Sequence, residues 1–398
     1  MLEICKWYQN AVSPVIFMID DFCNVWIDLN HNGKIDPGED WGYAQRNSGS
    51  SLYFLEQNIL DKFTEVKVTF FTPVGVRSPV IEKALFPFVS KQINCDEETK
   101  KFFRSVGENR KFEIAYHGTT HGRPGKIAAD FIQEWDSFVD LKQATDTIRT
   151  GINIYKDVFG KNPVGGKYCG YVANEFSDDS IDQNGFLWWC RYCNVDLIEN
   201  DNNPIEGDDQ YLLSNYDIKY FGKNKVVDIP TTINGSLCHI AYSNSFNVKN
   251  IGKKMLKPLI QSRKLEQLRY LLDNSLVISI QEHIAPSRAD GKRQMPNIFD
   301  DLDSLQMIFQ LLKGYPVWYC TCSELANYVR ARDNVDIIFD TQNSFTLETN
   351  ITGLEKTQLT LKMNSNNFKV IKQPDYSDVL IKNGLANIDV IKGKFFLY

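Results

Sequence analysis

Two adjacent carboxylates and three histidines are the residues of this sequence whose types and positions could do chemistry together. Asp20 and Asp21 follow directly after a run of five apolar residues, and His283 follows soon after another apolar run. His117 and His121 lie four residues apart, a spacing that on a helix or tight turn brings two imidazoles to one side. Two imidazoles with one carboxylate bind a divalent cation and leave positions open for water and substrate. The sequence therefore predicts a catalytic metal site.

Strands and helices alternate along the chain as far as about residue 332. The apolar run before Asp20 predicts a fully buried strand, and further strands are predicted at residues 66–71 and 111–116. A helix is predicted over residues 127–148, where apolar residues recur at helical spacing. Such alternation indicates an α/β fold with a mainly parallel sheet or barrel, whose ligands bind at the carboxyl ends of the strands.

The pattern changes near residue 333. Residues 345–349, 359–362 and 368–371 alternate apolar and polar side chains and are separated by turns rich in Asn and Gly. This pattern is typical of antiparallel strands. We therefore expect two domains, an α/β barrel over residues 1–332 and a small C-terminal antiparallel β module over residues 333–398.

Composition narrows the function classes. The 398 residues carry a net charge of −6 with no long basic run, so nucleic acid is not an expected partner. No stretch approaches the roughly 20 apolar residues that span a bilayer, and the first residues lack the pattern of a signal peptide. Nine cysteines, an odd number, favour reduced thiols over a disulfide framework, so we expect a cytoplasmic protein. Nothing in the sequence indicates the oligomeric state.

Three motifs, in this order, resemble those of the polysaccharide deacetylases (carbohydrate esterase family 4). They are Ile19-Asp20-Asp21, His117-Gly-Thr-Thr-His121 and the strand-end His283. The resemblance covers about residues 12–332 and includes residues 316–326, which are similar to the closing strand and helix of that family. It implies a distorted (β/α) barrel of about seven strands.

The resemblance also implies a role for each motif residue. Asp20 would be the catalytic base, Asp21, His117 and His121 the metal ligands, and His283 the catalytic acid. The chemistry of these groups agrees, because a divalent ion, with Zn²⁺ expected, polarises a carbonyl and lowers the pKa of its bound water. Asp20 could then accept the water's proton, and His283 could protonate the leaving amine.

The sequence departs from the family pattern where that family has an arginine followed by prolines. This chain has Lys167-Tyr168-Cys169-Gly170 there. Lys167 could orient Asp20 as a point charge, but it lacks the bidentate hydrogen bonding of an arginine. The backbone N–H near Gly170 would be the donor that stabilises negative charge on the carbonyl oxygen.

A second departure lies at the late histidine. Where the family has leucine-x-histidine, this chain has Gln281-Glu282-His283. Asp228 ends a predicted strand and has two interpretations. It is either the hydrogen-bond partner that orients His283 or an ordinary acid at the end of a surface strand.

Residues 28–39 match the pattern of a twelve-residue calcium loop, with a glycine at position 6 and an apolar residue at position 8. The same composition is equally typical of a turn rich in Asn, Gly and Asp. In either case the loop begins seven residues after Asp21, so we expect it to form one wall of the cleft. Its predicted Ca²⁺ ligands are Asp28, Asn30, Asn32, Asp36 and Glu39.

Together these features predict a metal-dependent hydrolase that removes an N- or O-acetyl group from an amino sugar or saccharide, in the biosynthesis of bacterial surface polysaccharide. Two alternatives remain open at this point. One is a glycoside hydrolase or a non-sugar amide hydrolase on a similar barrel; a glycoside hydrolase needs two carboxylates facing each other across the cleft. The other is a non-catalytic module that binds sugar.

Overall fold

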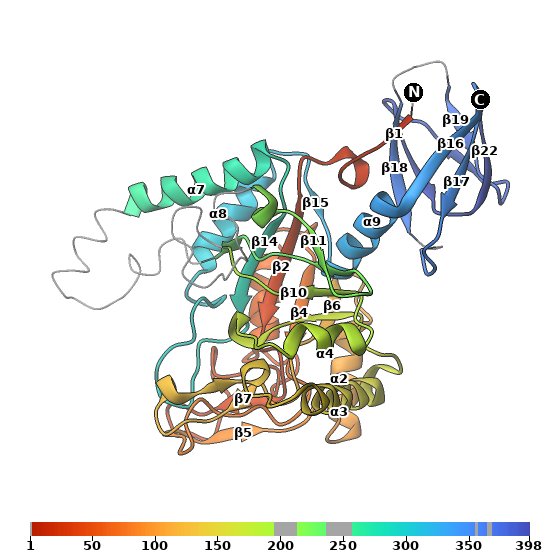
Figure 1. Ribbon diagram of the computed structural model, residues 1–398. Helices are drawn as coiled ribbons and strands as arrows, with labels where there is room; N and C mark the ends of the chain where they lie inside the picture. The colour runs from red at the N-terminus through yellow and green to blue at the C-terminus, as the bar shows by residue number, and fades with distance from the viewer. Residues whose placement is uncertain (1, 195–212, 236–256, 355–356, 364–367) are drawn as a thin grey trace.

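A computed structural model describes residues 2–194, 213–235, 257–354, 357–363 and 368–398 (Figure 1). Its main sheet is built from parallel strands that follow one another with helices between most of them. Around the sheet the strands run in the order β12, β10, β9, β6, β4, β2, β14, β13. Their bounds are β2 Pro14–Asp20, β4 Val68–Thr72, β6 Phe112–Tyr116, β9 Gly165–Lys167, β10 Trp188–Cys190, β12 Val226–Asp228, β13 Ile233–Asn234 and β14 Ile278–His283.

At one edge of the sheet β11 (Lys219–Phe221) adds an antiparallel strand beside β12, and only four residues connect β12 to β13 at the other edge. β12 pairs with β10 on one side, and β13 pairs with β14 on the other. Between them the Ile229 N–H donates to the Trp189 carbonyl at 2.9 Å, and the Thr232 N–H donates to the Ser279 carbonyl at 3.2 Å. In the described part of the chain the sheet therefore curls as a distorted barrel, as predicted.

Strand β2 is buried on both faces, which explains its continuous apolar run. Phe17 points outward and packs edge-on against Phe309 of α8 (Leu302–Leu312). Ile16 and Met18 belong to a different apolar cluster, together with the buried face of α9 (Cys322–Asn334). Since side chains alternate along a strand, Asp20 points to the same side as Met18, into the barrel.

The remaining helices include one correction. The predicted helix over residues 127–148 is wrong over its first half, because the helix α3 begins at Leu141 and runs to Phe159. Asp140 caps it by accepting a hydrogen bond from the Gln143 N–H. The segment before it holds the short strand β8 (Ile132–Gln133), and Ile132 is 43% exposed, so its apolar spacing marks no buried helical face. The other helices are α1 Ser51–Leu55, α2 Glu97–Gly107, α4 Ser177–Gln183 and α7 Lys257–Asp273.

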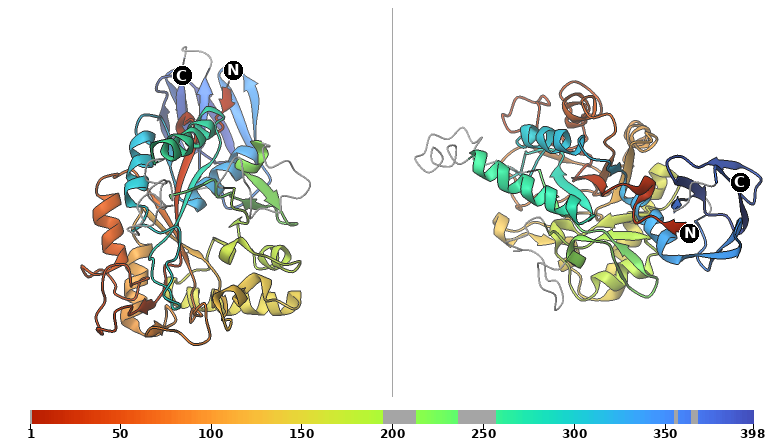
Figure 2. Two further views of the ribbon diagram at one scale, coloured as in Figure 1. Left: turned by 90° about the vertical axis from the view of Figure 1, so that its left-hand side faces the viewer. Right: turned by 90° about the horizontal axis from the view of Figure 1, so that it is seen from above.

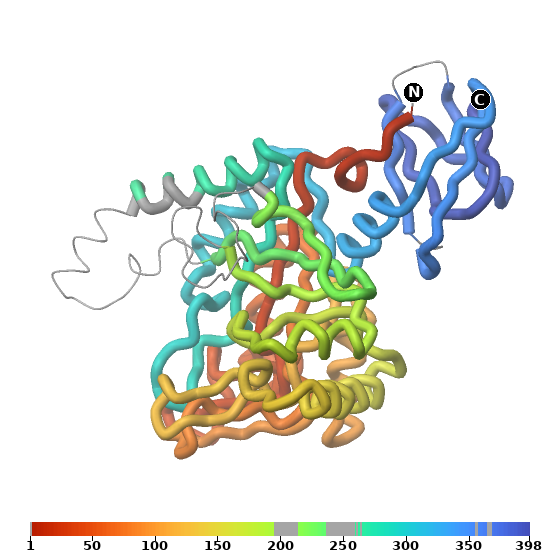
Figure 3. Tube along the Cα trace, viewed as in Figure 1, coloured from red at the N-terminus to blue at the C-terminus, as the bar shows by residue number. Residues whose placement is uncertain are grey.

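The C-terminal segment forms antiparallel sheets around its own apolar core, as predicted. Its strands are β16 Val335–Thr341, β17 Ser344–Thr349, β18 Gln358–Met363, β19 Val370–Lys372, β20 Asp378–Leu380, β21 Leu385–Asp389 and β22 Gly393–Leu397. The first strand of the chain, β1 (Leu2–Ile4), joins this module by pairing with β18. Both labelled chain ends therefore lie on the module, beyond the amino-terminal end of β2 (Figures 2 and 3).

The predicted boundary near residue 333 falls in the last turn of α9 and stays a prediction. No helix among the described residues is long and apolar enough to cross a membrane.

Candidate active site

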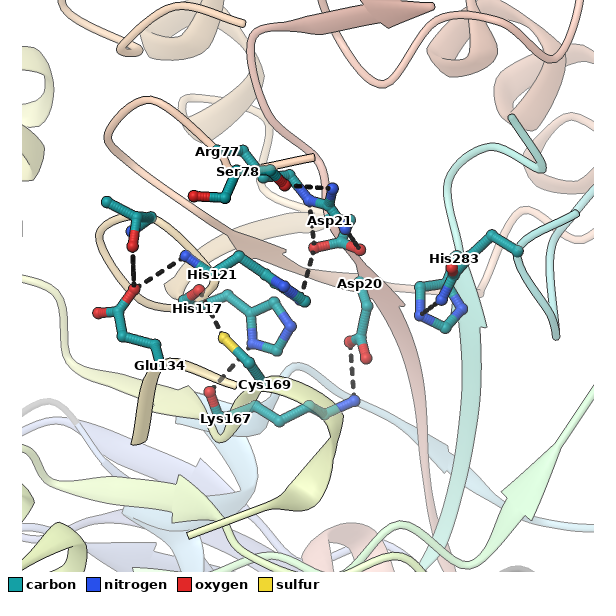
Figure 4. A network of polar contacts seen from close by, with 12 residues as sticks. Asp20, Asp21, Arg77, Ser78, His117, His121, Glu134, Lys167, Cys169 and His283 are labelled. Carbon is teal, nitrogen blue, oxygen red and sulfur yellow. Dashed lines mark hydrogen bonds and ion pairs between the residues drawn. The ribbon is translucent and has the colours of Figure 1, made fainter. Parts of the chain in front are cut away.

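The predicted catalytic residues gather at the carboxyl ends of the barrel strands (Figure 4). Asp20 ends β2 and His283 ends β14, and the two residues are partners in the register of these neighbouring strands. His117 follows β6, and Lys167 ends β9. All four therefore lie at one mouth of the barrel, where parallel strands place ligand-binding residues.

Asp20 is buried and held on both of its carboxylate oxygens. Lys167 Nζ donates to Oδ1 at 2.8 Å, and Gln281 Nε2 donates to Oδ2 at 3.2 Å. Lys167 is itself fully buried, and its ammonium lies 4.4 Å from the centre of the Phe71 ring. Asp20 is therefore an anion with a fixed orientation, and Gln281 contributes to it at the position where the family has leucine.

Asp21 faces a different cation. The Arg77 guanidinium grips it with two hydrogen bonds, Nε to Oδ1 at 3.2 Å and Nη2 to Oδ2 at 2.8 Å. Burial is the largest single influence and would raise the pKa of Asp21, but Arg77 together with His121, His117 and His283 outweighs it and holds the pKa well below its usual range. Arg77 is buried too, with its guanidinium 4.9 Å from the centre of the Trp41 ring. Sequence analysis missed Arg77, because nothing in its spacing connects a loop arginine to Asp21.

The two histidines are neutral imidazoles in fixed tautomers. His117 Nδ1 lies 3.0 Å from the Lys167 carbonyl oxygen, which can only accept, so Nδ1 carries the proton and Nε2 keeps its lone pair. His121 Nε2 lies 3.2 Å from Asp21 Oδ1, and His121 Nδ1 is buried without a hydrogen-bond partner. Burial lowers the pKa of both rings, so both are ready to act as ligands.

A buried carboxylate shapes the turn between these histidines. Glu134 accepts hydrogen bonds from the backbone N–H groups of Thr119, Thr120 and His121, at 2.9, 2.7 and 2.8 Å. A side chain at Gly118 would collide with Glu134, and the φ of 85° at that position also requires glycine. Sequence analysis missed Glu134, because it placed this residue on a helix.

His283 is oriented by the backbone. Its Nδ1–H donates to the Pro296 carbonyl at 2.7 Å, and its Nε2 accepts from the Gln294 amide at 2.9 Å. Asp228 does not reach it: Asp228 Oδ2 lies 3.5 Å from Arg191 Nη1. The structure therefore does not bring Asp228 and His283 together, because Asp228 lies on β12, beside β10 rather than β14. Burial raises the pKa of Asp228 to about 6 despite Arg191.

A group that could hold a metal ion consists of His117, His121 and Cys169, with ligand atoms within 4.8 Å of one another. Cys169 is fully buried, its Sγ donates to the His117 carbonyl at 3.3 Å, and burial raises the pKa of the thiol well above its usual value. Two neutral imidazoles, one with an unpartnered buried nitrogen, and a thiol suit Zn²⁺. These residues fit the predicted cofactor.

The loop of residues 28–39 packs beside the site. Its Glu39 carbonyl accepts from Ser287 Oγ at 3.2 Å, four residues beyond His283, so the loop lies against the segment that follows β14. Its predicted ligands are engaged with the loop itself, since Asp28 accepts from the Asn32 and Gly33 N–H groups. Asp36 accepts from the amides of Asn30 and Asn32, and Glu39 accepts from the Leu29 and Asp36 N–H groups. Calcium binding stays a prediction.

No protein-family model matches the chain, and no curated protein matches its sequence. Among solved structures it is similar to a "probable polysaccharide deacetylase" from Pseudomonas aeruginosa PAO1, at 13% identity and a TM-score of 0.48 over 80% of this chain and 91% of that one. An allantoinase, Puue, gives 14% identity and a TM-score of 0.48 over 80% and 91% of the two chains.

A family 4 acetyl xylan esterase from Clostridium thermocellum, solved with a cobalt ion, gives 11% identity and a TM-score of 0.38 over 79% of this chain and 90% of that one. The chain is thus similar in structure to polysaccharide deacetylases at low sequence identity.

Proposed function

We propose that this protein is a metal-dependent hydrolase that removes an acetyl group from an amino sugar or another saccharide. One observation carries the proposal. A buried carboxylate, Asp20, is held by Lys167 outside the His117–His121–Cys169 group, at the same barrel mouth as His283. A free base, a cation site and an acid in one place are what metal-assisted hydrolysis of an amide or ester requires.

The ion, when bound to this group, would polarise the substrate carbonyl and activate a water. Asp20 is the group that accepts the proton of the attacking water. Lys167 and Gln281 donate hydrogen bonds to it, and it is not one of the metal ligands. His283 exchanges a proton through Nε2, because Nδ1–H is held by the Pro296 carbonyl. Substrate would take the place of the Gln294 amide at that nitrogen.

The contacts of Asp21 argue against a glycoside hydrolase. That reaction needs two carboxylates that face each other across the substrate. Asp20 and Asp21 are neighbours in the chain, and Arg77 binds both oxygens of Asp21. The site therefore favours hydrolysis of an acyl group. We propose a saccharide as the substrate and a cytoplasmic biosynthetic pathway as the role.

The test measures metal content together with acetate release. Purified protein is assayed by elemental analysis and incubated with N-acetylated amino sugars and with O-acetylated xylo-oligosaccharides. We expect about one divalent ion per chain, and acetate release that falls by about 10²–10⁴-fold in Asp20→Asn with its metal retained. Asp61→Asn, a change of an exposed carboxylate, serves as the control and keeps full activity.

Three results would contradict the proposal. They are a wild-type protein without stoichiometric metal, no acetate release from either substrate class, or full activity of Asp20→Asn. Activity on a non-sugar amide alone would support the metal-dependent hydrolysis but contradict the proposed saccharide substrate.

A further inference from the structure

The charges at the barrel mouth cancel in pairs before any ion is bound. Lys167 neutralises Asp20, and Arg77 neutralises Asp21, with all four side chains almost completely buried. Both histidines are buried, and an imidazole that serves as a ligand brings no charge of its own. A divalent ion held by Asp21 and the two imidazoles would therefore enter a buried site with no uncompensated negative charge. Burying an ion without charge compensation costs several kcal/mol or more.

Asp21 is also badly placed to be a ligand. Its two oxygens are both bound by the Arg77 fork, and a ligand role would bring the ion next to a buried guanidinium of like charge. Among the described residues, the group of converging donor atoms includes the two histidines and Cys169 but not Asp21. The carboxylate instead contacts a ring nitrogen, His121 Nε2, at 3.2 Å.

This contact decides the tautomer of His121. The Asp21 oxygen, which also accepts from Arg77, accepts a hydrogen bond from Nε2–H, and this leaves the lone pair of the ring on Nδ1. Nδ1 is buried and has no hydrogen-bond partner, and a bound ion would supply one. A carboxylate that orients a metal-binding histidine from behind is a common arrangement around zinc.

Cys169 can supply the missing negative charge. It is fully buried, and its Sγ already contacts the His117 carbonyl, while the His117 ring is anchored to the Lys167 carbonyl two residues earlier. The turn after β9 and the turn after β6 are thus tied together by two hydrogen bonds that place the thiol beside the imidazoles (Figure 4).

We propose that Cys169, as a thiolate, completes the metal site with His117 and His121, and that Asp21 is a positioning residue bound to Arg77 rather than a ligand. Binding breaks the S–H bond, forms a metal–sulfur bond and releases the proton to solvent. This inference rests on the metal site of the proposed function and names its third ligand, for a thiophilic ion such as Zn²⁺.

The test uses the Co²⁺-substituted full-length protein. We expect a near-ultraviolet thiolate-to-cobalt charge-transfer band in the wild type that disappears in Cys169→Ser. Asp21→Asn should keep the band while its affinity for Zn²⁺ falls by about 10- to 100-fold, the usual effect of losing a residue that orients a ligand. Cys190→Ser changes another fully buried cysteine outside the group and should keep both band and affinity.

Thermal melts of each variant check folding. If Cys169→Ser does not fold, X-ray absorption at the zinc edge of the wild type decides, since the proposal requires one sulfur ligand. Stoichiometric cobalt without the band, or loss of metal in Asp21→Asn with metal retained in Cys169→Ser, overturns the proposal. A band without acetate release contradicts only the proposed function, whereas a wild type that binds no ion contradicts both.

Discussion

Arg77 and Lys167 explain how two carboxylates that are adjacent in the chain can both stay buried and ionised. Side chains alternate along β2, so Asp20 points into the barrel toward Lys167. At Asp21 the chain turns with a φ of 63°, and this side chain points to Arg77 instead. Each carboxylate thus has its own cation, and each pair depends on both partners.

Removing Arg77 tests this dependence. Arg77→Leu leaves the buried carboxylate of Asp21 unpaired, and we expect the free energy of unfolding to fall by about 3–5 kcal/mol. The double variant Asp21→Asn/Arg77→Leu should recover most of this loss, because neither charge is then left alone. Chemical denaturation of the metal-free proteins gives both values, and equal stability of Arg77→Leu and wild type would refute the pairing argument.

At the scale of elements, the strand ends were predictable and the loops were not. Asp20, His117 and His283 each follow an apolar run, so the position of a strand in the sequence fixes the position of the side chain. Arg77 and Glu134 lie on irregular segments, where no periodicity relates sequence position to direction in space. Asp228 was placed correctly at the end of a strand, but the sequence does not say which strands are neighbours.

Glu134 stabilises the conformation of the turn between His117 and His121. Glu134→Gln replaces a carboxylate that accepts three backbone hydrogen bonds with an amide that has one acceptor oxygen. We expect the protein to lose about 1.5–3 kcal/mol of stability and its affinity for Zn²⁺ to fall by about 10- to 100-fold. Competition with a metal chelator measures the affinity. Glu175→Gln, at an exposed carboxylate, is the control, and an equal affinity in both variants would argue against this role.

Asp40, which directly follows the loop of residues 28–39, holds the next turn and the start of α1 by accepting from the Gly42, Ala44 and Ser51 N–H groups. Burial raises its pKa to about 6, although these hydrogen bonds oppose the shift. A carboxyl with a raised pKa contributes stability that is present below its unfolded value of about 3.9 and is lost as the pH rises through about 6. Asp40→Asn does not titrate at this position.

We therefore expect the free energy of unfolding of the wild type to fall relative to Asp40→Asn by about 2 kcal/mol between pH 4 and 7, which is most of the effect of a shift of about two units at 1.36 kcal/mol each. Urea titrations at several pH values measure the difference. The surface variant Asp61→Asn should show no such trend, and a difference between wild type and Asp40→Asn that does not change with pH would disprove the assignment.

At the scale of the whole molecule, the alternation of strands and helices was enough to predict a barrel and a separate β module. It was not enough to predict what joins them. Leu2–Ile4 is too short to be recognised as a strand, yet Leu2 packs in the core of the module, and its partner in the register is Met363. A pairing between segments so far apart in the chain leaves no local signal in the sequence.

A single change in β1 tests this connection. Leu2→Asp places a charge in the module core, and we expect faster proteolysis within residues 335–398 while the barrel stays resistant. Glu3→Gln alters the exposed side of the same strand, and we expect this variant to be cleaved at the wild-type rate. Cleavage patterns followed by mass spectrometry decide, and identical rates for Leu2→Asp and wild type would show that β1 is dispensable for the module.

The pairing of β1 with β18 also sets an order of events during synthesis. A ribosome adds about 5–20 residues per second, so the roughly 360 residues between Leu2 and Met363 take about 20–70 s to make. During that time β1 has no partner, whereas β2, β4 and β6 can pair with one another as they appear. The residues of β1 are thus made before the barrel strands but reach their native contacts only once β18 exists, and a nascent chain stalled before β18 would hold an unpaired β1.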